Sequence, residues 1–223
     1  MQMRIATWNV NGSKARIDGL VAWLKEAEPD IACLQEIKSV DEGFPREPVE
    51  ALGYNVATHG EKSFNGVAIL SKRPFDDLRK GLPGDDGDLQ ARYLEAVVKA
   101  GTGVLRVASI YLPNGNPIGT GKFAHKLAWM TRLEAHAAEL LALEEPLVLA
   151  GDYNVIAQPE DARNPDAWTE DALFQPQSRS AFRRLLHLGL TDAVRAAGHG
   201  PGTYTFWDYQ AGEIGRASCR ERV

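Results

Sequence analysis

Polar residues that can bind a metal ion or a phosphate follow the ends of four separate apolar segments. Asn9 comes after "RIATW", Glu36 after "IACLQ" and Tyr111 after "RVASI". Asp152, with Asn154 two residues later, comes after "LVLAG". Hard divalent cations take carboxylate and carbonyl oxygens as ligands, and amide or phenol groups can stabilise a phosphate oxygen. Because α/β folds gather functional groups at strand ends, we expect these side chains to meet in one crevice.

Each of these residues, taken alone, also has an ordinary structural explanation. Asn9 suits a turn and Asp152 suits a cap. Glu36 could be a surface charge, and Tyr111 could be a half-buried aromatic. The coincidence of all four placements at strand ends is what favours a functional site over four unrelated structural roles.

The elements that would carry these residues follow an alternation of apolar strands and amphipathic helices. The pattern predicts strands over residues 4–10, 31–34, 66–70, 93–98, 104–111 and 147–150. Helical spacing recurs over residues 17–24, 127–141 and 182–186, and a solvated loop is expected over 81–90. This arrangement, with no low-complexity linker, indicates one α/β domain.

The composition and the net charge limit the classes of protein to which the chain can belong. The 223 residues carry a formal net charge of −5 and include two cysteines. That charge weighs against binding nucleic acid by bulk charge, although it leaves room for an enzyme with a local basic rim. No apolar stretch reaches the length of a membrane span, and the start lacks a secretory signal. We expect a cytoplasmic monomer that does not contact a membrane.

The ordered motifs resemble a known family. "ATWNVNG", "CLQEIK", "NGVAIL", "ARYLEA", "SIYLPNG" and "GDYNV" are similar to the signatures of the endonuclease/exonuclease/phosphatase superfamily, in order from about Met3 to Gly212. "KSFNGVAIL" and "TFWDY" narrow the resemblance to the DNA-repair branch that contains exonuclease III. The resemblance implies an α/β four-layer sandwich of two packed mixed β-sheets flanked by helices.

The same resemblance implies a reaction. It is hydrolysis of a phosphodiester on the 5′ side of an abasic site, with Mg²⁺ or alternatively Mn²⁺. The same site would remove nucleotides or phosphates from the 3′ ends of duplex DNA. Glu36 would be the main metal ligand with Asn9 beside it, and Asp152 would orient water or carry a proton. Asn154 and Tyr111 would donate hydrogen bonds to a phosphate oxygen.

Further matched positions are implied to contact DNA. Arg92, Asn114 and Lys122 lie where the family touches backbone phosphates, and their ordinary alternative is a plain surface role. Phe206 and Trp207, in "YTFWDY", would line the pocket for the baseless sugar or wedge the duplex. Their alternative is a core position. Extrusion of an abasic nucleotide is comparatively cheap because there is no base to unstack.

The end of the sequence departs from the family. After "DYQAG" the family continues with segments similar to "RIDHLL" and "SDHVPV", and neither occurs in the 223 residues. We expect residues 1–212 to be an incomplete endonuclease domain that lacks the last strands of its second sheet. Residues 213–223 are expected to be a tail derived from a sequencing adapter. The chain as given is expected to be nearly inactive.

None of the five histidines supplies the missing motif. His125 and His136 fall in the long helix and are expected to lie at the surface or in a groove.

Two other functions stay open at this point. The chain could be another phosphodiesterase of the superfamily, with a lipid, inositol or adenine pocket in place of the features around Lys122 and Phe206. It could also be a binder of damaged DNA that does not cleave it. Abasic DNA, phospholipid head groups and poly(A) would distinguish the enzymatic alternatives.

Overall fold

The computed structural model describes residues 3–198 and 203–205, and its chain divides into two compact units. The first unit holds the chain up to Tyr111 together with Glu139–Tyr153, and the second holds Leu112–Ala138 and the chain from Asn154 onward. The expected tail over residues 213–223 lies outside the described residues.

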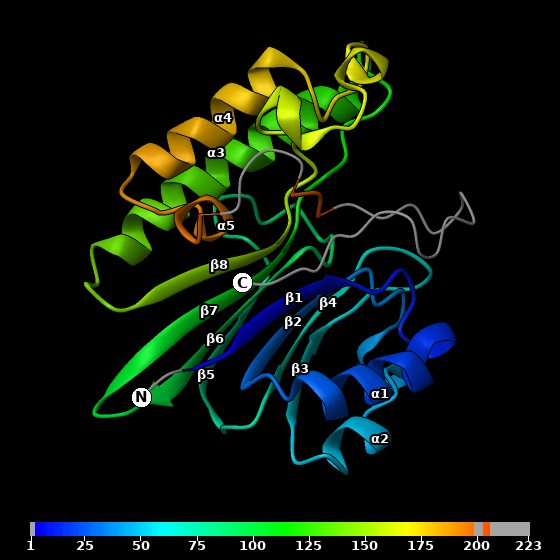
Figure 1. The fold of residues 1–223 in the computed structure, drawn as a ribbon, viewed down its shortest axis with the longest axis vertical. Helices are drawn as coiled ribbons and strands as arrows, with labels where there is room; N and C mark the ends of the chain where they lie inside the picture. Colours follow the sequence, from blue (N-terminus) through cyan, green and yellow to red (C-terminus); the bar gives the residue numbers. More distant parts are fainter. Residues whose placement is uncertain (1–2, 199–202, 206–223) are drawn as a thin grey trace. The chain divides into compact units, whose positions relative to one another are not determined.

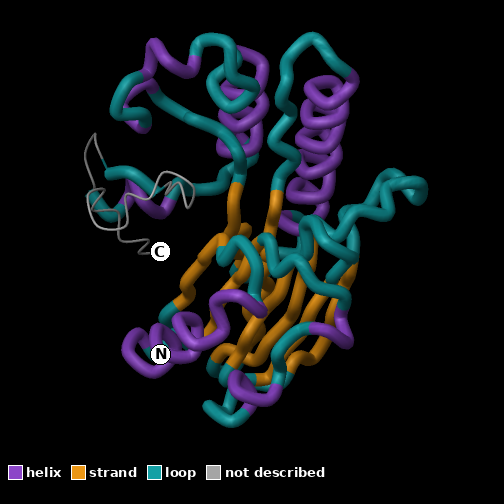
Figure 2. The backbone as a smooth tube through the Cα atoms, turned by 90° about the vertical axis from the view of Figure 1, so that its right-hand side faces the viewer, coloured by secondary structure: helices purple, strands orange, loops and turns teal. Residues whose placement is uncertain are grey.

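The eight strands within the described residues belong to the first unit and form two four-stranded sheets (Figures 1 and 2). In order across the first sheet these are β1 (Ile5–Asn9), β2 (Ile31–Gln35), β4 (Val67–Ser71) and β3 (Asn55–His59). Across the second sheet they are β5 (Phe75–Lys80), β6 (Tyr93–Ala100), β7 (Gly103–Tyr111) and β8 (Leu147–Asp152). The pairs β1–β2 and β7–β8 are parallel, and the other pairs are antiparallel. Both sheets are therefore mixed, as the family resemblance implied.

The two sheets pack face to face through a shared apolar core. Because side chains alternate along a strand, every second residue points into this core. The residues that do so include Ile31 and Cys33 of β2, Val107 of β7 and Ala150 of β8, all buried. The expected pair of packed mixed sheets with flanking helices is confirmed. The expectation about further strands of the second sheet stays a prediction.

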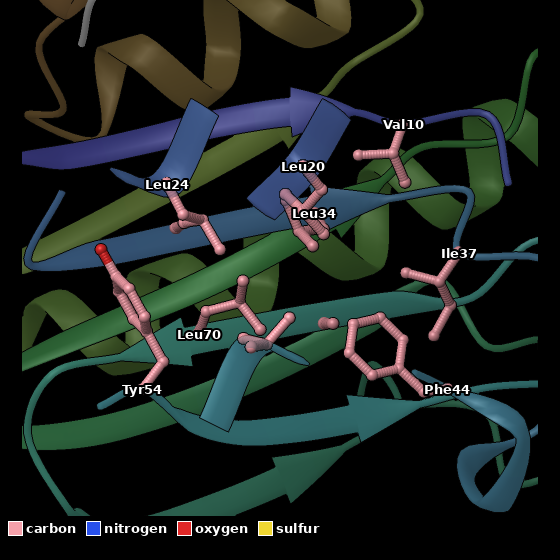
Figure 3. Close-up of a cluster of buried hydrophobic side chains, with 11 residues drawn as sticks. Val10, Leu20, Leu24, Leu34, Ile37, Phe44, Tyr54 and Leu70 are labelled. Carbon is pink, nitrogen blue, oxygen red and sulfur yellow. The ribbon is translucent and has the colours of Figure 1, made fainter. Parts of the chain in front are cut away.

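The other face of the first sheet is covered by the helices of the first unit. These are α1 (Ile17–Ala27) and the single turn α2 (Glu47–Glu50). Leu20 and Leu24 of α1 lie against Leu34 of β2, as Figure 3 shows. All three are at most 1% exposed, so α1 stabilises the sheet by burying its apolar face.

The described part of the second unit has helices and no strand. It contains most of α3 (Gly121–Leu141), together with α4 (Pro176–His187) and the short α5 (Ala193–Ala196). α4 lies beside α3 (Figure 1), and Arg184 Nε donates to Glu134 Oε2 at 2.9 Å. The expected position of His136 in α3 was the surface or a groove, and the surface is wrong, because the residue is only 6% exposed. No helix in the described part of the chain is both long and apolar enough to cross a membrane.

Gly151 allows β8 to lie close to β7 immediately before Asp152. A Cβ built at Gly151 would lie 2.0 Å from the carbonyl oxygen of Ile110, and the glycine has a φ of +151°. Only a residue without a side chain fits here. Gly151 therefore fixes the path that brings Asp152 into register with Tyr111.

We predict that Gly151→Ala destabilises the protein by about 3 kcal/mol, because the new methyl group must displace the β7 backbone. Gly101→Ala is the matched control, since Gly101 also has a positive φ but nothing lies within 4 Å of the place that its new methyl group would take. It should cost about 1 kcal/mol through backbone conformation alone. Urea unfolding of both variants measures the difference, and equal losses would contradict the steric argument.

Candidate active site

One amide joins two carboxylates that lie at the ends of strands from different sheets. Asn9 Nδ2 donates to Glu36 Oε1 at 2.8 Å and to Asp152 Oδ2 at 2.9 Å. Asn9 ends β1, Glu36 follows β2 and Asp152 ends β8. Three of the strand-end residues singled out in the sequence therefore meet within the first unit. The hydrogen bonds of the amide reduce the repulsion between the two carboxylates.

The loops after β1 and β2 are held to each other by main-chain hydrogen bonds. Val10 N donates to Gln35 O at 3.0 Å, and Gly12 N donates to Glu36 O at 2.7 Å. Glu36 has a φ of +52° and Asn11 a φ of +44°, which is uncommon for residues other than glycine. Such conformations persist only where the surroundings impose them, and they cluster at functional sites. The Glu36 side chain is thus aimed by a constrained turn.

Lys38 supplies a positive charge to the site that the sequence reasoning did not single out. Lys38 Nζ lies 3.0 Å from Glu36 Oε2 and also donates to Asn11 Oδ1. Its position two residues after Glu36, in "CLQEIK", was the available signal. In an extended strand that spacing would place both side chains on one face, but a turn follows β2 and obscures the pattern.

The environment of Glu36 favours its charged form. Burial by itself would raise the pKa of Glu36, but hydrogen bonds from Asn9, Lys38 and Tyr111 and the charge of Lys38 outweigh it, so the pKa is lowered. Glu36 is therefore a carboxylate at neutral pH, as a cation ligand must be.

Tyr111, at the end of β7, is held as a neutral hydrogen-bond donor. Burial raises its pKa first, and the nearby charges of Glu36 and Asp152 raise it further. The phenol hydrogen-bonds Glu36. Its predicted capacity to donate is thus present, and in this structure the bond goes to the carboxylate.

Arg92 packs on the ring of Tyr111. Its guanidinium carbon lies 4.8 Å from the ring centroid, and its Nη1 donates to the Tyr111 carbonyl oxygen at 3.3 Å. Burial lowers the pKa of Arg92, although a hydrogen bond with Tyr111 and the charge of Glu61 oppose this shift. The side chain is half-buried, so Arg92 is a positive group held beside Tyr111.

The donor set suits a hard cation. Glu36, Asp152 and Asn9 offer two carboxylates and an amide, and Mg²⁺ usually takes only one or two carboxylates and keeps several waters. Within residues 3–198 and 203–205, no three His, Cys, Asp or Glu side chains gather as a soft or all-protein metal cage would require. The residues present fit a divalent ion bound by oxygen.

A second group of the expected residues lies in the second unit. Asn154 has a φ of +47°, its Nδ2 donates to Leu112 O at 2.9 Å, and its Oδ1 accepts from Asn114 Nδ2 at 3.3 Å. Asn114 is exposed, and its own Oδ1 accepts from Asn116 N at 3.1 Å. The two asparagines are thus joined to each other.

Lys126 of α3 holds the backbone of both asparagines. Its Nζ donates to Asn114 O at 3.0 Å and to Asn154 O at 2.5 Å, and the residue is 0% exposed. A fully buried lysine is rare unless its charge is satisfied. Sequence reasoning missed Lys126, although a lysine placed among the apolar positions Trp129, Met130 and Leu133 of one helix was a usable signal.

The remaining expected residues have simpler environments. Lys122 is exposed in the first turn of α3, where its N–H donates to Thr120 Oγ1 at 3.3 Å. Phe206 and Trp207, expected to line a sugar pocket, lie outside the described residues.

We predict that Asn9→Ala raises the pKa of Glu36 towards its ordinary value of 4.5, because a lowering hydrogen bond is removed. A depressed folded-state pKa gives stability that is present above the unfolded value and lost as the pH falls through the folded one. Above pH 4.5, the unfolded value, the variant should therefore lose part of the unfolding free energy that the lowered pKa of Glu36 contributes. Carbon-13 NMR titration of Glu36 checks this, with Asn55→Ala as control at the far end of the sheet. An unchanged Glu36 titration in Asn9→Ala would contradict the assignment.

We also predict that Lys126→Met costs about 1–3 kcal/mol of unfolding free energy, because the carbonyls of Asn114 and Asn154 lose their donor. Lys122→Met is the control from the exposed start of the same helix and should change stability by less than about 0.5 kcal/mol. Urea unfolding gives both values. A Lys126→Met protein as stable as the parent would show that the buried ammonium does not hold these loops.

Comparison with known proteins assigns the chain to a family. Residues 6–216 match the Endonuclease/Exonuclease/phosphatase family. Exodeoxyribonuclease III of Haemophilus influenzae is 34% identical over 200 residues, which is 86% of this chain and 75% of that protein.

Two solved structures have the same fold. One is an AP endonuclease from Archaeoglobus fulgidus, with a TM-score of 0.89 and 33% identity over 99% of this chain and 85% of that one. The other is the 3′ phosphatase NExo from Neisseria bound to a product DNA hairpin, with a TM-score of 0.89 and 33% identity over 95% of this chain and 80% of that one. The amide that joins two strand-end carboxylates thus lies in a chain that belongs to the Endonuclease/Exonuclease/phosphatase family.

Proposed function

We propose that this chain is a DNA-repair phosphodiesterase of the exonuclease III type. It would cut duplex DNA on the 5′ side of abasic sites and remove nucleotides or phosphates from 3′ ends. The observation that carries the proposal is the bridge from Asn9 Nδ2 to Glu36 and Asp152, at 2.8 and 2.9 Å. The relatives support the same chemistry, since they include an exodeoxyribonuclease, an AP endonuclease and a 3′ phosphatase seen with DNA.

The proposed cofactor is Mg²⁺, with Mn²⁺ as an alternative. When bound, the cation would neutralise charge on the phosphate or on the leaving oxygen. Glu36 would hold it, because its lowered pKa keeps it ionised, with Asn9 beside it. Lys38, 3.0 Å from Glu36, would help to keep this carboxylate in place.

The remaining residues would act on water and on the phosphate. Asp152 would orient the attacking water or accept its proton as the bond from phosphorus to the 3′ oxygen breaks. Tyr111 and Asn154 would donate hydrogen bonds to the phosphate oxygens, where charge develops in the transition state. The raised pKa of Tyr111 supports this role, since the phenol keeps its proton at neutral pH.

The contacts with DNA would come from basic and amide side chains. Arg92, Asn114 and Lys122 would bind backbone phosphates, which adds affinity without reading sequence. Phe206 and Trp207 would line the pocket for the baseless sugar. With a formal net charge of −5, affinity would depend on this local set rather than on overall charge. We propose a cytoplasmic monomer that acts on its own.

The function can be tested with a duplex that contains one abasic-site analogue, with the protein in excess over DNA. We expect Mg²⁺-dependent cleavage on the 5′ side of the lesion that stops when EDTA is added. Glu36→Gln should slow cleavage by about 100-fold or more, because cation binding contributes several kcal/mol. Glu26→Gln, an exposed glutamate in α1, is the matched control and should cleave like the parent.

Other outcomes would favour the alternatives. Hydrolysis of phospholipid head groups or poly(A) in place of abasic DNA would favour another phosphodiesterase of the superfamily. Binding of damaged duplex without Mg²⁺ and without cleavage would favour a binder that does not cut. Either result would overturn the proposal.

The low turnover expected from the sequence is a separate prediction. We expect residues 1–223 to cleave about 10²–10⁴-fold more slowly than the Haemophilus influenzae relative, because the Asp-His motif that would activate water does not occur in them. Single-turnover rates of the two proteins on the same duplex measure the ratio. Rates within a few-fold of each other would contradict the prediction while leaving the proposed function intact.

A further inference from the structure

A glutamine, Gln35, occupies a core position on β2 immediately before Glu36 of the candidate site. On β2 the side chains that point between the two sheets are Ile31, Cys33 and Gln35, and the first two belong to the apolar core. Gln35 is 1% exposed, as buried as its apolar neighbours. Burying an amide in an apolar core costs free energy unless its hydrogen bonds are made. The hydrogen-bond partners of Gln35 therefore indicate why it is found there.

The Gln35 amide is bonded to three strands. Its Nε2 lies 3.1 Å from each of three acceptors, namely Thr7 Oγ1 on β1, the Cys33 carbonyl on β2 and Ser109 Oγ on β7. Its Oε1 accepts from Thr7 Oγ1 at 3.3 Å. Because β1 and β2 belong to one sheet and β7 to the other, the amide links the two sheets.

A second hydrogen bond closes the link. Ser109 is 0% exposed, and its Oγ donates to the Leu34 carbonyl at 3.0 Å. Ser109 thus accepts from a side chain of β2 and donates to the main chain of β2. We call Thr7, Gln35 and Ser109 the inter-sheet junction.

Each member of the inter-sheet junction lies next to a residue of the candidate site on the same strand. Gln35 is followed at once by Glu36. Thr7 precedes Asn9 by two residues and Ser109 precedes Tyr111 by two, so in both pairs the side chains share one face of the strand. The junction is therefore one step further into the core than the groups proposed to act.

Stability alone gives no reason for a polar junction in this place. Replacing a buried polar pair with apolar side chains of the same shape is often neutral or stabilising. The directional bonds of a fully satisfied polar network fix one relative position of the groups that they join, and apolar packing does this less well. Here the joined groups are the two sheets, at the end where Glu36 and Asp152 emerge.

We propose that Gln35 is a positioning residue whose amide, through Thr7 and Ser109, sets the separation of the two sheets beneath Glu36, Asp152 and Tyr111. This inference rests on the proposed function, since it assigns the junction to the cation site of that reaction. Loss of the junction should weaken cation binding more than it weakens the fold. Outer partners that orient metal ligands typically change affinity by about 10–100-fold when removed.

The experiment measures Mn²⁺ binding by titration calorimetry on the whole chain, together with thermal unfolding without metal. Gln35→Leu and Ser109→Ala should each lower Mn²⁺ affinity by about tenfold or more. Ser71→Ala is the matched control, because Ser71 is also 0% exposed in a strand and lies at the other end of the first sheet, opposite Ile31. It should bind Mn²⁺ as the parent does.

A pair of variants at Thr7 separates positioning from mere folding. Thr7→Val removes the hydroxyl but keeps the shape, and it should lose affinity as Gln35→Leu does. Thr7→Ser keeps the hydroxyl and should retain parental affinity. Parental Mn²⁺ affinity in both Gln35→Leu and Thr7→Val would overturn the inference, as would losses that simply follow the unfolding temperature across all variants.

The proposed function fails in a different way. If the parent chain binds no Mn²⁺, the cation site itself is wrong, and the positioning role falls with it. If the parent binds Mn²⁺ and Gln35→Leu and Thr7→Val bind it with the same affinity, the cation site stands and the positioning role alone is refuted.

Discussion

The candidate site depends on one interaction, the bond of the Asn9 amide to two carboxylates that come from different sheets. Glu36 and Asp152 would repel each other if nothing donated to both, and the repulsion would act across the core that joins the sheets. Asn9 Nδ2 meets both oxygens within 2.9 Å and satisfies them. A divalent cation would satisfy the same oxygens with more charge. The two carboxylates therefore favour positive charge at this point of the fold, and the Asn9 amide supplies only a partial positive charge.

The same strand alternation that makes the core also makes the site. Along β1, β2, β7 and β8, the side chains between the sheets are apolar at one end and become polar towards the other. The progression on β7, from Val107 through Ser109 to Tyr111, shows this change within five residues. Because both sheets carry the gradient in the same direction, the apolar core ends in a cluster of polar and charged side chains. This alternation is sufficient to bring Asn9, Glu36, Tyr111 and Asp152 together within the first unit.

The same alternation explains which strands could be predicted from the sequence. The strands found in advance include buried runs such as β2 and β7, whose apolar residues and the polar residues at their ends are visible in the sequence. The two that patterning missed, β3 and β5, lie at sheet edges, and β5, "FDDLRK", is exposed along most of its length. An exposed edge strand has no reason to alternate strongly. The convergence of Asn9 with Asp152, 143 residues apart, came from the family resemblance and the strand-end rule and not from any local signal.

Buried polar groups were the harder class to foresee. Gln35, Lys126 and His136 all read as polar residues that belong outside, yet each is at most 6% exposed. The burial of Gln35 and Lys126 is explained by partners far away in the sequence, as when Lys126 donates to the carbonyls of Asn114 and Asn154. Lys126 and Asn9 have similar roles as donors, because the Lys126 ammonium bonds two carbonyls and the Asn9 amide bonds two carboxylates. In both cases a single donor fixes two chain segments at once, and a donor of that kind defines a geometry more sharply than apolar packing of the same volume.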